Sequence, residues 1–332
     1  MKKIKPFILH NHYVRPGDHG LIKLQVGKLP SGTMISIHAH VYHSHKPGPV
    51  VMILGGLHGD EINGIEIVRR AIFDKIFDEI LCGTIIAVPL VNVHGFIKLS
   101  RNISEGKDVN RSFPGSLKGS IASKVARTIT KYILPLVNFG LDFHSGAANR
   151  YNFPQVRYSN LDPRAIQLAQ DFGPPFIIHK ELIPDSLRKT AYEKNIPILV
   201  YEGGEALRLD GLSIDQGLIG LRRVLASQGI LPEAPPINHS IINIKKAVWM
   251  RAKKAGLFMW TKQSGDLVQV GDALGFYHDR DGLEQIVINA TRSGYIIAHN
   301  NNPVVNQGDA IFHIGYEYEV LPAVNRQGNY FP

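Results

Sequence analysis

A histidine and a glutamate lie three positions apart in a glycine-rich segment, GGLHGDE at residues 55–61. The segment follows an apolar run at residues 50–54 and precedes a helical pattern, which indicates a strand-to-helix turn. In such a turn the side chains of His58 and Glu61 can converge on one point, and glycine lets the backbone pass close to that point. Because zinc accepts imidazole nitrogen and carboxylate oxygen, the segment predicts two metal ligands.

A catalytic zinc site needs a third protein ligand and keeps one position for water. The best candidate is His144 in the segment LDFHSG, at the end of an apolar strand over residues 140–143. Ligands bind at the carboxyl edge of an open α/β sheet, so the two strand ends can meet there, with Asp142 orienting a ligand histidine. Taken singly, His58 and Glu61 also suit a helix N-terminus, and His144 also suits a strand end. Together the three favour one zinc ion per chain.

The base of a hydrolase should be a carboxylate that lies near the metal but is not one of its ligands. Glu202 directly follows the apolar strand at residues 196–201 and therefore projects at a strand end. Strand ends also carry acids into solvent, and Glu205 lies close enough to be confused with Glu202. We favour Glu202 because it ends the strand itself.

A polar loop, DVNRSFPG at residues 108–115, follows a buried strand predicted at residues 84–91. Arginine binds carboxylates through two parallel hydrogen bonds and can stabilise a developing oxyanion. Arginines in a surface turn are the commoner explanation, yet a loop this polar after a buried strand suits ligand binding. We therefore expect Arg101, Asn110 and Arg111 to belong to the site.

The elements that must position these residues alternate between strands and helices. We predict an antiparallel edge strand at residues 33–45 and further strands at 50–54, 84–91, 140–143, 176–179 and 196–201. Helical periodicity covers residues 62–77, 120–136, 162–172 and 185–194. The alternation predicts an α/β domain in which helices flank a mixed sheet.

The sequence changes character at the proline-rich segment PEAPPIN, residues 232–238. We predict a catalytic domain at residues 1–235 and a smaller all-β domain at 236–332, with an internal echo between VGDAL at 270–274 and QGDAI at 307–311. A layout of two similar β-halves resembles the lipoyl and biotinyl type of barrel-sandwich domain, whose hairpin often carries a modified lysine. No lysine follows Lys262, so we expect a structural or substrate-shaping role.

Four motifs occur in the order found in the succinylglutamate desuccinylase and aspartoacylase family, relatives of zinc carboxypeptidases: HGDE, DVNRSFPG with Arg101 before it, DFHSG and YEGG. The chain resembles this family over residues 50–205, and the resemblance implies a zinc-carboxypeptidase-like α/β domain followed by a β domain. It also implies the site roles: His58, Glu61 and His144 bind zinc, Arg101 polarises the scissile carbonyl, Asn110 and Arg111 hold a substrate carboxylate, and Glu202 activates water. No residue matches the family's recognition of an acyl or side-chain carboxylate, for which Arg188 and Arg208 are the candidates.

Length and composition bound the remaining possibilities. A chain of 332 residues with 44% hydrophobic content exceeds the usual single-domain length and should fold. Its one cysteine, Cys82, fits a reducing compartment, and the start of the chain lacks the apolar core of a signal peptide, so we expect a cytoplasmic protein. The net charge of +9 is spread along the chain without a nucleic-acid-binding motif, so we expect neither nucleic-acid nor membrane partners and allow for a homo-oligomer.

These patterns favour a zinc-dependent amidohydrolase that removes the acyl group from an N-acyl amino acid or a similar small carboxylate. One alternative is a zinc carboxypeptidase that trims peptides or cell-wall fragments through a more open cleft. A second, from another class, is a metal-binding sensor or assembly module without turnover. The candidate base and two arginines argue for an enzyme, because binding alone needs fewer of them.

Overall fold

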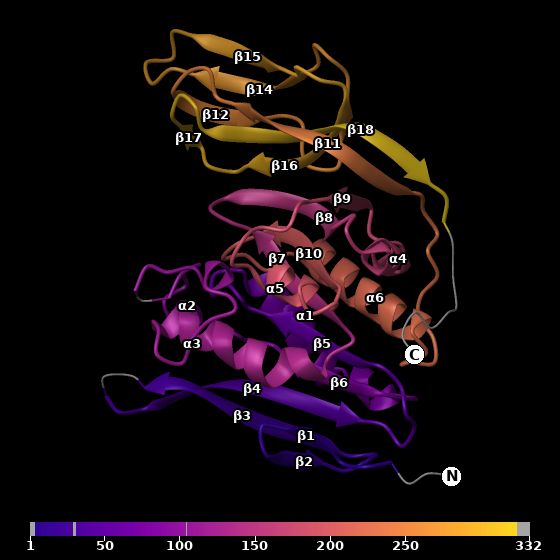
Figure 1. Cartoon of the computed structure of the whole chain (residues 1–332). Coiled ribbons are helices and arrows are strands. Elements are labelled where there is room, and N and C mark those ends of the chain that lie inside the picture. The colour runs from indigo at the N-terminus through magenta and orange to yellow at the C-terminus, as the bar shows by residue number, and fades with distance from the viewer. Residues whose placement is uncertain (1–3, 29–30, 104, 324–332) are drawn as a thin grey trace.

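The computed structural model describes residues 4–28, 31–103 and 105–323, and its strands fall into one large and two small sheets (Figure 1). The strands of the first part are β1 (Phe7–Leu9), β2 (His12–Val14), β3 (His19–Lys28), β4 (Met34–His43), β5 (Val50–Gly55), β6 (Thr84–Val88), β7 (Phe139–Gly146), β8 (Arg150–Tyr158), β9 (Phe176–His179) and β10 (Ile198–Glu205). The helices are α1 (Ile62–Phe73), α2 (Val93–Ile97), α3 (Ile121–Thr128), α4 (Pro163–Phe172), α5 (Leu187–Tyr192) and α6 (Gly211–Ser227). The later strands are β11 (Ile241–Arg251), β12 (Gly256–Trp260), β13 (Leu267–Val268), β14 (Ala273–His278), β15 (Gln285–Asn289), β16 (Gly294–Asn300), β17 (Val304–Val305) and β18 (Ala310–Leu321).

The large sheet is mixed and has the strand order β13-β16-β18-β11-β9-β8-β10-β7-β5-β6-β4-β3. Its centre is parallel, because β5 pairs in parallel with both β6 and β7, and β10 pairs in parallel with β7. The carboxyl ends of these strands therefore lie along one edge, where the functional residues follow. The expected α/β fold with a mixed sheet is confirmed.

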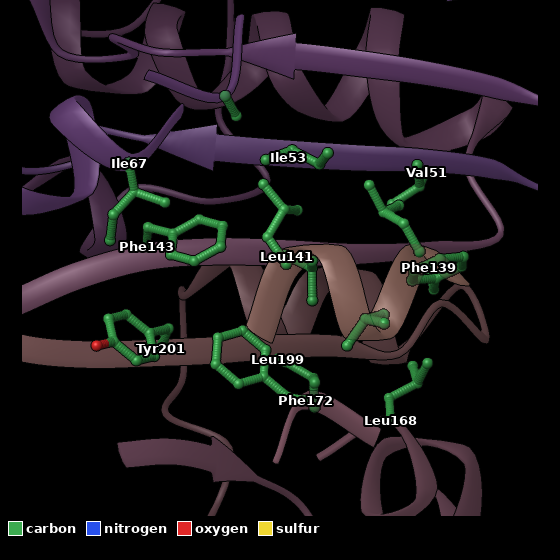
Figure 2. Close-up of a cluster of buried hydrophobic side chains, with 14 of the residues drawn as sticks. Val51, Ile53, Ile67, Phe139, Leu141, Phe143, Leu168, Phe172, Leu199 and Tyr201 are labelled. Atoms are coloured by element: carbon green, nitrogen blue, oxygen red, sulfur yellow. The ribbon is translucent and has the colours of Figure 1, made fainter. Parts of the chain in front are cut away.

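Buried side chains cover both faces of the central strands. In β5, Val51 and Ile53 belong to one hydrophobic cluster, and Met52 and Leu54 belong to the other. Figure 2 shows the first cluster, in which Phe143 of β7 lies beside Ile67 of helix α1 and Tyr201 of β10. Burial on both faces explains why these strands are apolar at successive positions.

The edge strand expected at residues 33–45 is not at the edge. Strand β4 pairs on one side with β6 and on the other with β3, which occupies the edge itself. In β3 buried positions alternate with exposed ones, a pattern that indicates a strand with one covered face, and it was missing from the prediction.

Other predicted elements are shorter than expected. Strand β6 stops at Val88 because Pro89 follows, and helix α1 stops at Phe73, just before Lys75 adopts a left-handed conformation with φ 58°. The helix expected at residues 120–136 is regular only to Thr128 and continues as a π turn and a 3-10 turn.

Strand β8 and helix α6 were not predicted. Glycines at three positions of α6 lower its helix propensity, which explains why periodicity alone did not reveal it. The structure shows their use: a Cβ on Gly220 would lie 1.9 Å from Cε1 of Phe172, and one on Gly217 would lie 2.4 Å from Cδ1 of Ile67. The absence of side chains there lets α6 pack closely against α4 and α1.

The C-terminal strands form a β-sandwich that shares a sheet with the first part, as the upper, orange-to-yellow region of Figure 1 shows. Strands β12, β14, β15 and β17 make a separate four-stranded sheet, whereas β11 pairs in parallel with β9 and so extends the large sheet. The sequence echo corresponds to two similar turns, in which Gly271 and Gly308 both have φ 93° and Asp272 and Asp309 accept backbone hydrogen bonds. The domain division at residues 235 and 236 stays a prediction.

Within residues 4–28, 31–103 and 105–323, no helix is long and apolar enough to cross a membrane. Two expectations stay predictions. One is the reducing compartment, which was inferred from the single cysteine, and the other is the homo-oligomer.

Candidate active site

Three of the predicted residues form one buried group. The turn from β5 into α1 carries His58 and Glu61, and the end of β7 carries His144. Nδ1 of His58 lies 2.8 Å from Oε1 of Glu61, Nδ1 of His144 lies 2.7 Å from Oε2 of Glu61, and the two Nδ1 atoms are 3.2 Å apart. All the ligand atoms lie within 4.8 Å of one another.

Glycines allow the backbone around this group to pack closely. A Cβ on Gly59 would lie 2.0 Å from the carbonyl carbon of Gly95, and a Cβ on Gly64 would lie 2.1 Å from the carbonyl oxygen of Phe143. Any larger residue at these positions would push the turn and helix α1 away from their neighbours. The glycines therefore set the distance between Glu61 and the end of β7.

Each histidine of the group has a carboxylate on its other ring nitrogen. Nε2 of His144 lies 2.8 Å from Oδ2 of Asp142, and Nε2 of His58 lies 3.2 Å from Oδ1 of Asp108. This arrangement fixes the ring orientation and leaves Nδ1 of each histidine to face Glu61. Asp142 was expected in such a position, whereas the contact between Asp108 and His58 was missed, since a loop residue gives no periodic signal.

The ionisation of the group favours a cation. Burial works against a charged His144, but Asp142 and Glu61 outweigh it and raise the pKa of the imidazole well above its usual value. Burial likewise opposes a charged Glu61, yet His58 and His144 bring the pKa of its carboxyl well below the usual range. An ionised carboxylate thus faces two imidazoles in a site that favours positive charge.

The donor set fits a divalent metal such as zinc. It offers two imidazole nitrogens and one carboxylate oxygen, the same ligand types as in catalytic zinc sites with three protein ligands. Two ligands of one tetrahedral zinc ion lie about 3.4 Å apart, because each is about 2.0–2.1 Å from the metal. The two Nδ1 atoms are 3.2 Å apart, close to that separation, and each faces a different oxygen of the Glu61 carboxylate at 2.8 and 2.7 Å.

Arg101 reaches into the same group. Its Nη1 donates to Oε1 of Glu61 at 2.9 Å and its Nη2 donates to Oδ2 of Asp108 at 3.0 Å. Asn110 and Arg111 line the same cavity, and Oδ1 of Asn110 accepts a hydrogen bond from the backbone of Leu187 at 2.9 Å. The predicted loop therefore lies beside the three clustered side chains.

Glu202 also lines the cavity, and it lies opposite His144 in the pairing of β10 with β7. Glu205, its possible substitute, is not among the cavity residues and instead contacts Asn301 and Arg208. Of the two arginines considered for a second carboxylate, Arg188 lines the cavity and the exposed Arg208 does not.

The cavity has a volume of about 600 Å³ and includes residues that sequence reasoning missed. Strand β8 contributes Arg150, Asn152 and Arg157, and β11 contributes Trp249 from the C-terminal region. Alternating polar positions in β8 were the available signal, but its Pro154 obscured the strand pattern. Nothing in the sequence indicates that Trp249 lines this cavity.

A sheet edge that combines a buried His-Glu-His group with a separate carboxylate and several guanidinium groups is the architecture of a metal-dependent hydrolase. The chain belongs to the succinylglutamate desuccinylase and aspartoacylase family, because the model of the Succinylglutamate desuccinylase/Aspartoacylase catalytic domain matches residues 47–228, more than half of the chain. Family and site together define a metal-dependent deacylase that acts on amide bonds. The predicted class of enzyme is confirmed.

Individual relatives extend the likeness over nearly the whole chain. An N-alpha-acetyl-L-2,4-diaminobutyric acid deacetylase of Halomonas elongata is 28% identical over 322 residues, which cover 92% of this chain and 93% of that protein. The product-bound ectoine utilization protein EutE (DoeB) of Ruegeria pomeroyi has a TM-score of 0.81 at 23% identity, covering 95% of this chain and 100% of that one. A succinylglutamate desuccinylase/aspartoacylase structure from Rhodobacter sphaeroides has a TM-score of 0.79 at 23% identity, covering 91% and 95% of the two chains. The two structures show that the fold, including the C-terminal β region, is shared.

Proposed function

We propose that this protein is a zinc-dependent deacylase that hydrolyses the amide bond of an N-acyl amino acid, releasing the acyl group as a carboxylic acid. The observation that carries the proposal is the convergence of His58, Glu61 and His144 beside Glu202 and Arg101 in one cavity. The Halomonas relative, a deacetylase of an N-acetylated amino acid, supports this substrate class.

The ligands of the metal would be Nδ1 of His58, Nδ1 of His144 and the carboxylate of Glu61. When bound, zinc supplies Lewis-acid chemistry that polarises a carbonyl group and makes water more acidic. Asp108 and Asp142 keep the ligand rings in place through their contacts with Nε2.

The remaining side chains divide the other tasks. Glu202 accepts the proton of the attacking water and passes it to the nitrogen of the leaving amine. The guanidinium of Arg101 stabilises the oxyanion that develops on the scissile carbonyl. Asn110 and Arg111 hold the carboxylate of the amino acid, for which the planar guanidinium of Arg111 offers two parallel donors.

The positive charge of the cavity wall supports a substrate that carries a carboxylate. Among the described residues, Arg150, Lys180 and Arg188 line the cavity without a carboxylate at ion-pair distance. Burial, with Arg157 nearby, lowers the pKa of Arg188 to about 10, and burial with Arg157 and Arg188 lowers the pKa of Lys180. Cations that disfavour one another in this way would gain from a bound anion.

The test is a substrate screen with protein of known metal content. Purified protein loaded with zinc is offered N-acetyl and N-succinyl amino acids, including N-acetyl-L-2,4-diaminobutyrate, beside short peptides with free carboxyl termini. Release of a free amine and of the matching acid, both identified by mass spectrometry, is the expected result for N-acyl amino acids. Hydrolysis confined to the peptides, or none by protein that holds about one zinc per chain, would contradict the proposal.

A further inference from the structure

The candidate base Glu202 is held by two side chains of strand β8. Nη1 of Arg157 lies 2.8 Å from Oε1 of Glu202, and Nδ2 of Asn152 donates to Oε2 of Glu202 at 2.9 Å. The contacts are well shielded from solvent, since the side chain of Glu202 is only 10% exposed. Each oxygen of the carboxylate thus has its own donor, and both donors come from the neighbouring strand.

A shift in strand register brings Asn152 to this position. In the antiparallel pairing of β8 with β10, Arg157 lies opposite Val200 and Gln155 lies opposite Glu202. Regular pairing would continue with Phe153 opposite Gly204, but Asn152 occupies that place because the register shifts there. Since a shift of one residue moves side chains to the other face of a sheet, it puts Asn152 on the face of Glu202.

Phe153, the residue that the shift displaces from its place opposite Gly204, makes a packing contact of its own. Phe153 packs against Phe176, with ring centroids 5.1 Å apart, in the cluster that joins β8 and β9 to the C-terminal strands. The region of the shift therefore makes two contacts, one between Asn152 and Glu202 and one between Phe153 and Phe176. Packing of Phe153 in this cluster holds β8 in place and so supports the groups that hold Glu202.

The charges near Arg157 favour its pairing with Glu202. Arg157 is one of the causes that lower the pKa values of Lys180 and Arg188, so it lies within a cluster of cations. Among the described residues, Glu202 is the carboxylate that forms an ion pair with the guanidinium of Arg157. Arg101, whose Nη1 donates to Glu61, lines the same cavity as Glu202. Without Arg157 the carboxylate would be free to turn toward Arg101.

We propose that Arg157 and Asn152 are positioning residues that fix the orientation of the Glu202 carboxylate for proton transfer. A carboxylate oxygen has two acceptor sites, and each oxygen of Glu202 uses one of them for these contacts. One site on each oxygen therefore stays available for a proton. The inference rests on the proposed role of Glu202 and adds the groups through which its orientation is controlled.

The experiment is a double-mutant cycle between Arg157 and Glu202, measured on any amide or activated ester that the wild type hydrolyses. The single variants are Arg157→Ala, Asn152→Ala and Glu202→Gln, and the double variant combines Arg157→Ala with Glu202→Gln. We expect Arg157→Ala to lower kcat about tenfold to hundredfold with little change in KM, because misplacing a catalytic group by about 1 Å costs about that much. The double variant should be no slower than Glu202→Gln alone, since Arg157 would act only through Glu202.

Two further measurements separate positioning from a merely structural role. Guanidinium at millimolar concentration should restore part of the kcat of Arg157→Ala, and Arg157→Lys should lie between Arg157→Ala and the wild type. Arg222→Ala is the matched control, because it removes a guanidinium that pairs with Glu79 at 2.8 Å outside the cavity. Its kcat and KM should equal those of the wild type.

The outcomes that overturn the inference are distinct from failure of the proposed function. An increase in KM at unchanged kcat would make Arg157 a substrate-binding residue, and additive losses in the double variant would mean that it acts independently of Glu202. Should the wild type hydrolyse none of the compounds, the proposed function fails, and a crystal structure of Arg157→Ala still decides the positioning claim. The Glu202 carboxylate should have turned away from Asn152, and an unmoved carboxylate would refute that claim.

Discussion

Glu202 lies directly opposite His144 in the parallel pairing of β10 with β7, although the two residues are far apart in the sequence. The pairing places the candidate base one strand away from a candidate metal ligand, at the carboxyl edge of the sheet. Neither residue needs a long loop to reach the other, because backbone hydrogen bonds between the strands fix their separation. A rigid scaffold of this kind suits a reaction that depends on the position of a proton acceptor.

The first prediction concerns the base. Glu202→Gln keeps the size of the side chain and removes its ability to take a proton, so kcat should fall about a hundredfold or more. The zinc content, measured by inductively coupled plasma mass spectrometry, should stay at the wild-type value because Glu202 is not among the clustered ligands. Turnover equal to that of the wild type would exclude Glu202 as the base.

The second prediction concerns the carboxylate behind a ligand histidine. Asp142→Asn removes the charge that lies 2.8 Å from Nε2 of His144, and the affinity for zinc should fall about tenfold to hundredfold. Competition with a chromophoric chelator measures the change. Asp215→Asn, which alters an exposed carboxylate on α6, serves as the control and should bind zinc as the wild type does. Equal affinities for both variants would show that Asp142 does not support the metal.

The third prediction concerns the charge of the substrate. Because Arg150, Lys180 and Arg188 line the cavity without carboxylate partners among the described residues, a second carboxylate on the substrate should bind there. N-acetyl-L-glutamate should therefore show a KM about tenfold lower than N-acetyl-L-2,4-diaminobutyrate, which carries an amine at the corresponding position. Steady-state kinetics on the two compounds decide the matter. A lower KM for the amine would mean that the cations face away from the bound side chain.

The fourth prediction concerns stability in acid. Burial lowers the pKa of His299 to about 4, and its Nδ1 accepts hydrogen bonds from the backbone and the hydroxyl of Ser264 at 3.0 and 2.7 Å. The unfolded chain binds this proton near pH 6.5, so between pH 6.5 and about 4 the unfolded state holds more protons and stability falls as the pH falls. At pH 5 this group alone should cost roughly 2 kcal/mol relative to neutral pH.

His299→Asn keeps an acceptor for Ser264 but has no proton to gain, so it should lose less stability than the wild type between pH 7 and pH 5. Urea denaturation at both pH values measures the difference, and the loss due to other groups cancels in the comparison. The exposed His12, changed to Asn, is the control. An identical loss in His299→Asn and the wild type would contradict the prediction.

The fifth prediction concerns close packing beneath the site. Gly64→Ala would place a Cβ 2.1 Å from the carbonyl oxygen of Phe143, so α1 must move away from β7. Overpacking of this kind costs about 1–3 kcal/mol, and the shift should also weaken zinc binding through Glu61. Gly211→Ala is the control, because a Cβ there meets no atom within 4 Å. Thermal unfolding that is the same for the two variants would refute the packing argument.

The sequence predicted that the candidate site residues lie together, because most of them directly follow buried strands. His58, His144 and Glu202 each come at or just after an apolar run, and runs of this kind indicate strands whose carboxyl ends share an edge. The order of four short motifs was enough to indicate the family. All seven residues assigned to the site line the observed cavity: His58, Glu61, Arg101, Asn110, Arg111, His144 and Glu202.

Only the tertiary structure decided which residues surround Glu202 and which segments close the cavity. Asn152 reaches Glu202 because of a one-residue register shift between β8 and β10, and Trp249 reaches the cavity because β11 pairs with β9. Both depend on pairing between segments that are distant in the sequence, which local periodicity does not encode. Strand ends are set by nearby residues, whereas register and strand order are set by packing across the whole sheet.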